Sequence, residues 1–122
     1  MFKKCIFILA TSCMMYSCTT QTETNPFLTE FQTEHGVPPF DKIKLEHYEP
    51  AFLKGIEEQN ANIDAIVNNS EAPTFENVIV ALDNSSPLLD RVSAIFYNMT
   101  EAETTDDLKE LSIKLAPTLS EH

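Results

Sequence analysis

Apolar side chains recur every three or four residues through most of the chain from Tyr48 to Leu119. This spacing matches the period of an α-helix and places the apolar residues on one face of each helical segment. The chain contains only two glycines, and no stretch has the alternation of apolar and polar residues that half-buried strands show. The pattern predicts an all-α fold with three main antiparallel helices and short connections.

The first helix is expected over about residues 46–68, with its start between Leu45 and Pro50. Amides in the first turn have no partner inside the helix, so a proline in that turn would cost nothing. Glu46 and Glu49 would then lie near the positive end of the helix dipole, which favours acids. The apolar face of this helix consists of Tyr48, Phe52, Ile56, Ile63 and Val67.

The second helix is expected over about residues 74–101, with Thr74 as its amino-terminal cap. Pro87 cannot donate to the carbonyl of Asp83, and Ser86 followed by a proline also resembles the start of a new helix. The apolar phase nevertheless continues through the polar serines, which favours one long helix kinked near Pro87 over two helices joined by a turn. The residues that share this phase are Phe75, Ile79, Leu82, Leu89, Val92, Phe96 and Met99.

The third helix is expected over about residues 105–121. Thr104 and Asp107 have the spacing of a capping box, and Pro117 implies a kink or a termination near the carboxyl end. The apolar face of this helix consists of Leu108, Leu111, Leu115 and Leu119.

Residues 1–17 have the pattern of an export signal: Lys3 and Lys4 precede the apolar run CIFILATSCMMYS, which is too short to span a bilayer permanently. Ser17 followed by Cys18 resembles the site at which bacterial lipoprotein signal peptidase cuts before the cysteine is acylated. We therefore predict lipidation at Cys18, with an ordinary cleaved signal and an incidental cysteine as the alternative. The prediction implies an exported lipoprotein anchored on the periplasmic side of a bacterial envelope.

Residues 18–34 are interpreted as a lipidated tether and docking segment, and residues 35–122 as the helical segment. A tether does not need aromatic side chains, so we expect Phe27 and Phe31 to dock on another part of the protein. All three cysteines lie in the first eighteen residues, so stability must come from packing instead of disulfides.

The chain is strongly acidic, with nineteen acidic residues against eight basic ones, two of which are in the signal segment. Such a surface repels phosphate backbones and anionic headgroups. We therefore expect no nucleic-acid partner, and membrane contact only through the lipid anchor.

The stretch PPFDKIKLEHYEPAF places a histidine between two glutamates, but it lacks the spacing of a metal site. His47 lies two positions from Glu49, and His35 and His122 are distant in the sequence. We interpret His47 as a structural residue at the helix entry and assign no metal ligand.

No residue has the setting of a catalytic nucleophile, because no free cysteine follows Cys18 and no Gly-x-Ser-x-Gly elbow is present. We interpret the adjacent carboxylates as solvated charges and the glycosylation sequons as chance, and we assign no catalytic or cofactor-binding residue. The carboxylate pairs are Glu57 with Glu58 and Asp106 with Asp107, and the sequons begin at Asn68, Asn84 and Asn98.

The stretches PPFDKIKLEHYEPAF and APTFENVIVALD resemble the amino-terminal region of the bacterial peptidyl-dipeptidases, or dipeptidyl carboxypeptidases, of the thimet oligopeptidase family of zinc metallopeptidases. The resemblance extends over about residues 25–122. It implies a helical protein of two lobes around a channel, in which zinc is held by a His-Glu-x-x-His helix and a later glutamate. It also implies release of dipeptides from the carboxyl end of oligopeptides. None of those functional residues has a matching position here, so zinc ligands are expected outside this chain.

Two functional hypotheses follow. In the first, the chain is the amino-terminal part of an exported zinc peptidase and is inactive alone. Its partners are then an oligopeptide substrate and the remaining polypeptide of the enzyme. That polypeptide would cover the apolar faces that begin at Tyr48, Phe75 and Leu108. In the second, it is an autonomous acidic helical lipoprotein that binds a partner without catalysis. The binding surface would be formed by Phe27, Phe31, Tyr48 and Phe52.

Overall fold

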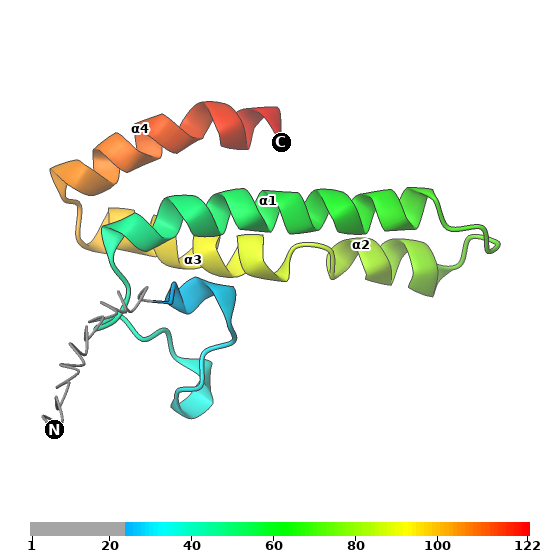
Figure 1. Cartoon of the computed structure of the whole chain (residues 1–122), viewed down its shortest axis with the longest axis horizontal. Helices are drawn as coiled ribbons and strands as arrows, with labels where there is room; N and C mark the ends of the chain where they lie inside the picture. The colour runs from blue at the N-terminus through cyan, green and yellow to red at the C-terminus, as the bar shows by residue number, and fades with distance from the viewer. Residues whose placement is uncertain (1–23) are drawn as a thin grey trace, which may run out of the picture.

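The computed structural model describes residues 24–122, and all regular elements in this part of the chain are helical (Figure 1). The expected all-α fold is therefore confirmed. The signal segment and Cys18 lie outside the described residues. The elements are two short 3₁₀ turns, η1 (Pro26–Leu28) and η2 (Glu34–Gly36), followed by α1 (Leu45–Val67), the π-type turn η3 (Phe75–Val80), α2 (Ala81–Asp83), α3 (Pro87–Ala102) and α4 (Asp106–Glu121).

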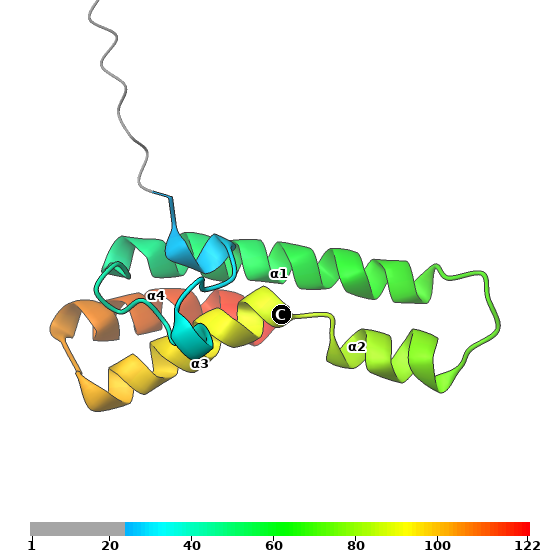
Figure 2. The same cartoon turned by 90° about the horizontal axis from the view of Figure 1, so that it is seen from below.

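Helix α1 is the longest element, and the chain folds around it (Figures 1 and 2). After α1 the chain turns back, so that η3, α2 and α3 run along α1 in the opposite direction. Helix α4 then returns beside the first half of α1, while η1 packs against both α1 and α3. In residues 24–122, no helix is both long and apolar enough to cross a membrane.

The core lies where α1, α3, α4 and η1 meet, and aromatic rings form its centre. The ring of Phe96 packs edge-on against Tyr48 and Phe52, with centroid distances of 5.1 and 5.4 Å. Such aromatic pairs contribute about 0.5–1.5 kcal/mol beyond the area they bury. The buried apolar residues are Phe27, Tyr48, Ala51, Phe52, Leu88, Val92, Ile95, Phe96, Leu108, Leu111 and Leu115.

The docking of the aromatic residues before α1 is confirmed. Phe27 is fully buried, and its ring centroid lies 5.2 Å from that of Tyr48. Its backbone carbonyl accepts a hydrogen bond of 2.7 Å from Nη2 of Arg91. The same guanidinium lies 5.4 Å above the ring of Phe31, a cation–π arrangement. These contacts hold the segment before α1 against α3.

The predicted range of the first helix is confirmed within one residue at each end, but the expected place of Pro50 is wrong. Because α1 begins at Leu45, Pro50 lies in the second turn and has no amide to donate to the carbonyl of Glu46. The helix continues through the proline because its neighbours Tyr48, Ala51 and Phe52 are buried in the core. The carboxylate of Glu49 was expected to interact with the positive end of the helix dipole. In the structure it accepts a 2.6 Å hydrogen bond from Nζ of Lys114 in α4.

The expected single long helix over residues 74–101 is also wrong, because α2 ends at Asp83 and α3 begins at Pro87. The structure has the other alternative, two helices with a short non-helical link. Pro87 cannot continue the ladder of backbone hydrogen bonds. The carbonyl of Ser85 instead accepts a 2.8 Å hydrogen bond from Nδ2 of Asn62 in α1, and Ser85 is 1% exposed. Thr74 caps η3 as expected, accepting the amide of Asn77.

The third helix has its predicted range, but its cap is Thr105 and not Thr104. Oγ1 of Thr105 accepts the amide of Leu108 at 3.2 Å, whereas the hydroxyl of Thr104 donates to the carbonyl of Thr100. Pro117 lies inside α4, which continues to Glu121, so the proline does not terminate the helix.

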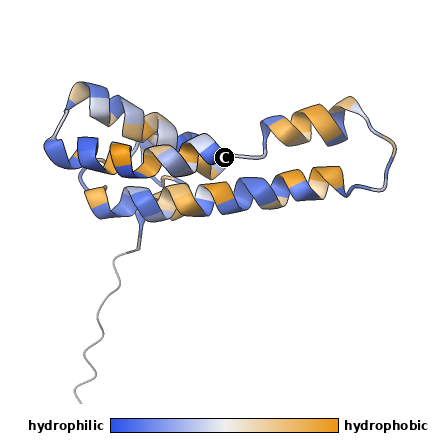
Figure 3. Cartoon of the chain, turned by 90° about the horizontal axis from the view of Figure 1, so that it is seen from above, coloured by the Kyte–Doolittle hydropathy of each residue, from blue (hydrophilic) through white to orange (hydrophobic). Residues whose placement is uncertain are grey.

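The three apolar faces are not equally covered within the chain. The face that begins at Leu108 and the first part of the face that begins at Tyr48 are buried against one another and against α3, so the expectation that these parts await further polypeptide is wrong. The face that begins at Phe75 is exposed only in its first part, on η3 and α2: Phe75 is 66% and Leu82 50% accessible, beside Val67 of α1 at 75%. Its continuation on α3, at Val92 and Phe96, is buried in the core. Figure 3 shows hydrophobic residues gathered at this end, where η3 and α2 lie near the end of α1. We call this end the tip.

Candidate functional site

His47 has a structural role at the start of α1, as predicted. The residue is 5% exposed, and its Nδ1 accepts the backbone amide of Lys44 at 3.0 Å. This bond satisfies one of the amides that the helix itself leaves unpaired. The backbone carbonyl of His47 accepts a 2.7 Å hydrogen bond from Nδ2 of Asn25, which ties the preceding segment to α1. His47 therefore caps the start of α1 and also anchors the segment that contains η1.

The structure does not bring the three histidines together. Nε2 of His35 lies 3.4 Å from the exposed carboxylate of Glu34, and Nε2 of His122 lies 2.5 Å from Oε1 of Gln59. Within residues 24–122, no three His, Cys, Asp or Glu side chains are placed so that they could hold a metal ion. The residues of this region therefore do not fit the zinc that the resemblance implies.

The carboxylate pairs identified in the sequence lie on exposed helix surfaces. Glu57 accepts a 3.0 Å hydrogen bond from Lys54, and Asp106 accepts one of 3.2 Å from Lys109, each from a lysine on the same helix. Surface pairs of this kind contribute about 0–1 kcal/mol. They stabilise helices locally and are not placed as a catalytic acid and base.

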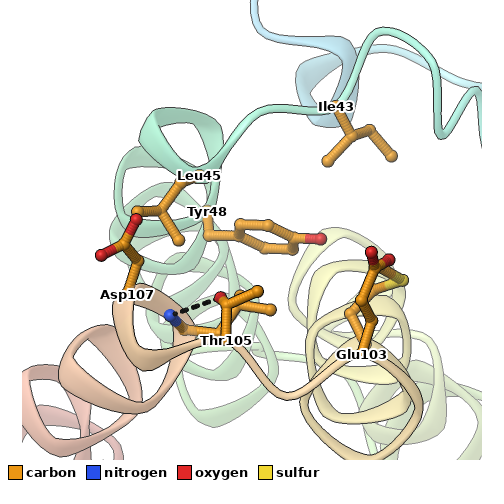
Figure 4. A pocket seen from close by; sticks show the side chains of 8 residues that line it. Ile43, Leu45, Tyr48, Glu103, Thr105 and Asp107 are labelled. Atoms are coloured by element: carbon orange, nitrogen blue, oxygen red, sulfur yellow. Dashed lines mark hydrogen bonds between the residues drawn. The ribbon is translucent and has the colours of Figure 1, made fainter.

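A hollow of about 200 Å³ lies where the start of α1, the end of α3 and the start of α4 meet (Figure 4). The ring of Tyr48 forms its centre, and the hydroxyl points into it on the side of Glu103. Thr105 caps α4 at the edge of the hollow. The hollow is lined by Ile43, Leu45, Tyr48, Met99, Glu103, Thr105, Asp107 and Leu108.

Burial raises the pKa of Tyr48 above its ordinary value of 10.0. The hydroxyl therefore keeps its proton at neutral pH and can both donate and accept a hydrogen bond. The sequence pattern assigned Tyr48 to an apolar face and gave no sign of this hollow, because Ile43 and Tyr48 lie far in the sequence from Met99 and Glu103.

A second hollow, of about 350 Å³, lies between the end of α1 and the η3–α2 segment, next to the exposed residues of the tip. Four asparagines contribute to it, so it is more polar than the neighbouring surface. Nδ2 of Asn77 donates to the carbonyl of Ala72 and Nδ2 of Asn84 to that of Val80, so these two amides serve the local backbone. The lining residues are Asn62, Ala65, Ile66, Asn69, Asn77, Ala81 and Asn84.

The sequence is similar to those of several peptidases. It is 44% identical over 88 residues to dipeptidyl carboxypeptidase of Salmonella typhimurium and 41% identical over 100 residues to dipeptidyl carboxypeptidase of Escherichia coli. These matches cover 72% and 82% of this chain. The chain belongs to the thimet oligopeptidase family. The chain is also 30% identical to oligopeptidase A of Escherichia coli over 99 residues, which are 81% of the chain. No protein-family model matches the chain.

The matched residues of this thimet oligopeptidase family member represent only 13–15% of the length of these relatives. The family assignment made from the two quoted stretches is confirmed. The binding surface of the alternative hypothesis is not available, however, because Phe27, Tyr48 and Phe52 are buried within the chain. An exposed apolar surface is found instead at the tip.

Proposed function

We propose that this chain is the amino-terminal part of an exported zinc metallopeptidase that releases dipeptides from the carboxyl end of oligopeptides. The observation that carries the proposal is the 41% identity over 100 residues with a protein named dipeptidyl carboxypeptidase. The match includes most of the helical core, so the similarity extends well beyond a single motif.

In this proposal the described helices support the enzyme, and hydrolysis belongs to polypeptide outside the chain. The sequence of 122 residues contains no His-Glu-x-x-His motif, and residues 24–122 hold no cluster of metal-binding side chains. The exposed residues Val67, Phe75 and Leu82 support the presence of a further polypeptide neighbour at the tip. The zinc and its ligands, and the oligopeptide substrate, are assigned to the complete enzyme.

The decisive test is the DNA that follows the codon of His122. A continuous reading frame that encodes His-Glu-x-x-His supports the proposal, and a functional protein without such a frame contradicts it. In parallel, the purified 122-residue chain should release no dipeptide from a blocked tripeptide in the presence of zinc. Turnover that a chelator abolishes would show that this chain itself contains an active site.

The proposal includes export and lipid anchoring at Cys18, which the run of apolar residues and the preceding Ser17 support. Growth of producing bacteria with labelled palmitate should label the wild-type chain and the Cys13→Ser variant, but not the Cys18→Ser variant. Equal labelling of both variants would exclude Cys18 as the acylated residue.

A second candidate function is an autonomous, non-enzymatic binding module. It is favoured by the core itself, in which Tyr48, Phe52 and Leu108 are buried without any further polypeptide. Its binding surface would be the tip. A sharp, cooperative thermal transition that includes the tip would support this alternative, whereas early loss of the tip would support the peptidase.

A further inference from the structure

The ring of Tyr48 is buried, but its hydroxyl oxygen remains accessible from one side. Tyr48 is only 4% exposed, and its ring is fixed between Phe27 at 5.2 Å and Phe96 at 5.1 Å. Among residues 24–122 no hydrogen-bond partner reaches this hydroxyl, which points into the hollow described above (Figure 4). Because this hydroxyl is accessible and can both donate and accept a hydrogen bond, its direction indicates where a polar ligand atom would lie.

The walls of the hollow combine aliphatic surface with negative charge. Ile43, Met99 and Leu108 provide apolar contacts, while Glu103 and Asp107 provide carboxylates. An adjoining hollow of about 290 Å³ is lined by Ile43, Tyr48, Met99 and Glu103 again, and adds the ring of Phe40, which is 52% exposed. Among these described lining residues there is no lysine, arginine or histidine. The surroundings therefore favour a cation on an aliphatic stem, with carboxylates and aromatic rings to receive the charge.

The volume restricts the size of the group. Pockets for drug-sized ligands occupy about 300–1,000 Å³, so a hollow of about 200 Å³ fits one long side chain better than a whole small molecule. The acidic excess of the chain also attracts basic groups and repels acidic ones.

We propose that this hollow, built around Tyr48 and Glu103, binds one lysine or arginine side chain carried by polypeptide of the same peptidase outside this chain. The inference rests on the proposed function and names a contact that would join this region to the rest of the enzyme. The relatives support this choice of occupant because the matched region is 13–15% of their length, which leaves most of the polypeptide to supply the side chain. The aliphatic stem would lie on Ile43, Met99 and Leu108, with the charged end between the hydroxyl and the carboxylate.

The test uses the 122-residue chain with ¹³C-labelled methionine methyl groups. Met99 lines the hollow and is the single methionine among residues 24–122, so its methyl signal reports on the hollow. The probe is N-acetyl-lysine methylamide, and its neutral counterpart is N-acetyl-norleucine methylamide, which has a stem of similar length without the ammonium group. The lysine probe should shift the Met99 methyl signal saturably, with a dissociation constant on the order of millimolar.

The Glu103→Gln variant should bind the lysine probe about tenfold more weakly, because a hydrogen bond to a charged group is lost. Glu101→Gln is the matched control: it removes the same charge two residues earlier, from the exposed surface of the last turn of α3 and outside the hollow, and should bind like the wild type. Circular dichroism of both variants checks that their helices are retained.

Three results would overturn the inference. Equal binding of the norleucine probe would show an apolar hollow without preference for a cation, and equal weakening in both glutamine variants would show only general attraction to an acidic protein. A Met99 shift that depends on protein concentration without any probe would identify a second copy as the occupant. None of these results bears on the downstream reading frame, so the inference and the proposed function can fail separately.

Discussion

Replacement of Gly55 by alanine should destabilise the chain, although alanine is the better helix former. Gly55 is buried in α1 where that helix crosses α3. A Cβ atom on residue 55 would lie 2.9 Å from both the Cα and the backbone nitrogen of Leu89. Because these are backbone atoms, no flexible side-chain end can move aside. The two helices would have to separate locally.

Two opposing effects set the change in the free energy of unfolding. Alanine gains about 1 kcal/mol over glycine inside a helix. Overpacking a well-filled contact costs about 1–3 kcal/mol, and a clash with backbone on both sides of the contact belongs in the upper part of that range. We therefore expect the Gly55→Ala variant to lose about 1–2 kcal/mol of unfolding free energy. Each kilocalorie lowers the melting temperature of a domain of this size by about 4–8 °C.

The assay is thermal and urea unfolding of the 122-residue chain, followed by far-UV circular dichroism. Ala61→Gly, at an exposed position of the same helix, measures the propensity term alone and should cost about 1 kcal/mol. If Gly55→Ala instead stabilised the chain by that same amount, α1 and α3 could not approach each other as closely as described. The argument for a contact set by glycine would then be refuted.

Three further changes test the core, a cap and the hydroxyl of Tyr48. Phe96→Ala should lower the unfolding free energy by about 3–5 kcal/mol in urea titrations, because the ring is 1% exposed and contacts three other aromatic rings. Thr105→Ala should cost about 1 kcal/mol in the same titrations, and Thr104→Ala clearly less, since only the hydroxyl of Thr105 caps α4. Burial raises the pKa of Tyr48 in the folded chain above 10.0. The stability that this group contributes is therefore fully present below about pH 10, and it is lost as the pH rises through the folded-state pKa. Urea titrations from about pH 9 to about pH 11 should show this part of the alkaline loss in the wild type and not in Tyr48→Phe.

Helical periodicity predicted the main helices well but did not reveal the break in the second one. The spacing of apolar residues shows which face of a helix each residue lies on. Two successive helices with a common axis can keep this spacing across a short link, so the spacing does not reveal the break. The link is fixed by the missing amide of Pro87 and by the long-range hydrogen bond from Asn62 to the carbonyl of Ser85. The proline was visible in the sequence, whereas the partner in α1 depends on how the helices align.

The helix caps and the hollow at Tyr48 were predictable to different degrees. His47 could be assigned to the helix entry because its distance from other candidate ligands left no metal site to build. The choice between Thr104 and Thr105 depends on the exact turn at which α3 ends, which propensity does not specify. The hollow at Tyr48 could not be predicted at all, since it forms only when residues 43–48 meet the turn from α3 to α4, which lies much later in the chain.

The two halves of α1 differ in a way that favours the peptidase over the autonomous module. In the first half, Tyr48, Ala51, Phe52 and Gly55 are buried by partners inside the chain. Beyond Asn62 no residue of the helix is buried, and Val67 lies exposed beside the apolar residues of the tip. A module adapted to stand alone in water would carry polar side chains on that surface, because exposed apolar patches promote association. The same helix thus belongs to the core at one end and leaves apolar side chains exposed at the other, as the proposed peptidase predicts, because its remaining polypeptide would cover the tip.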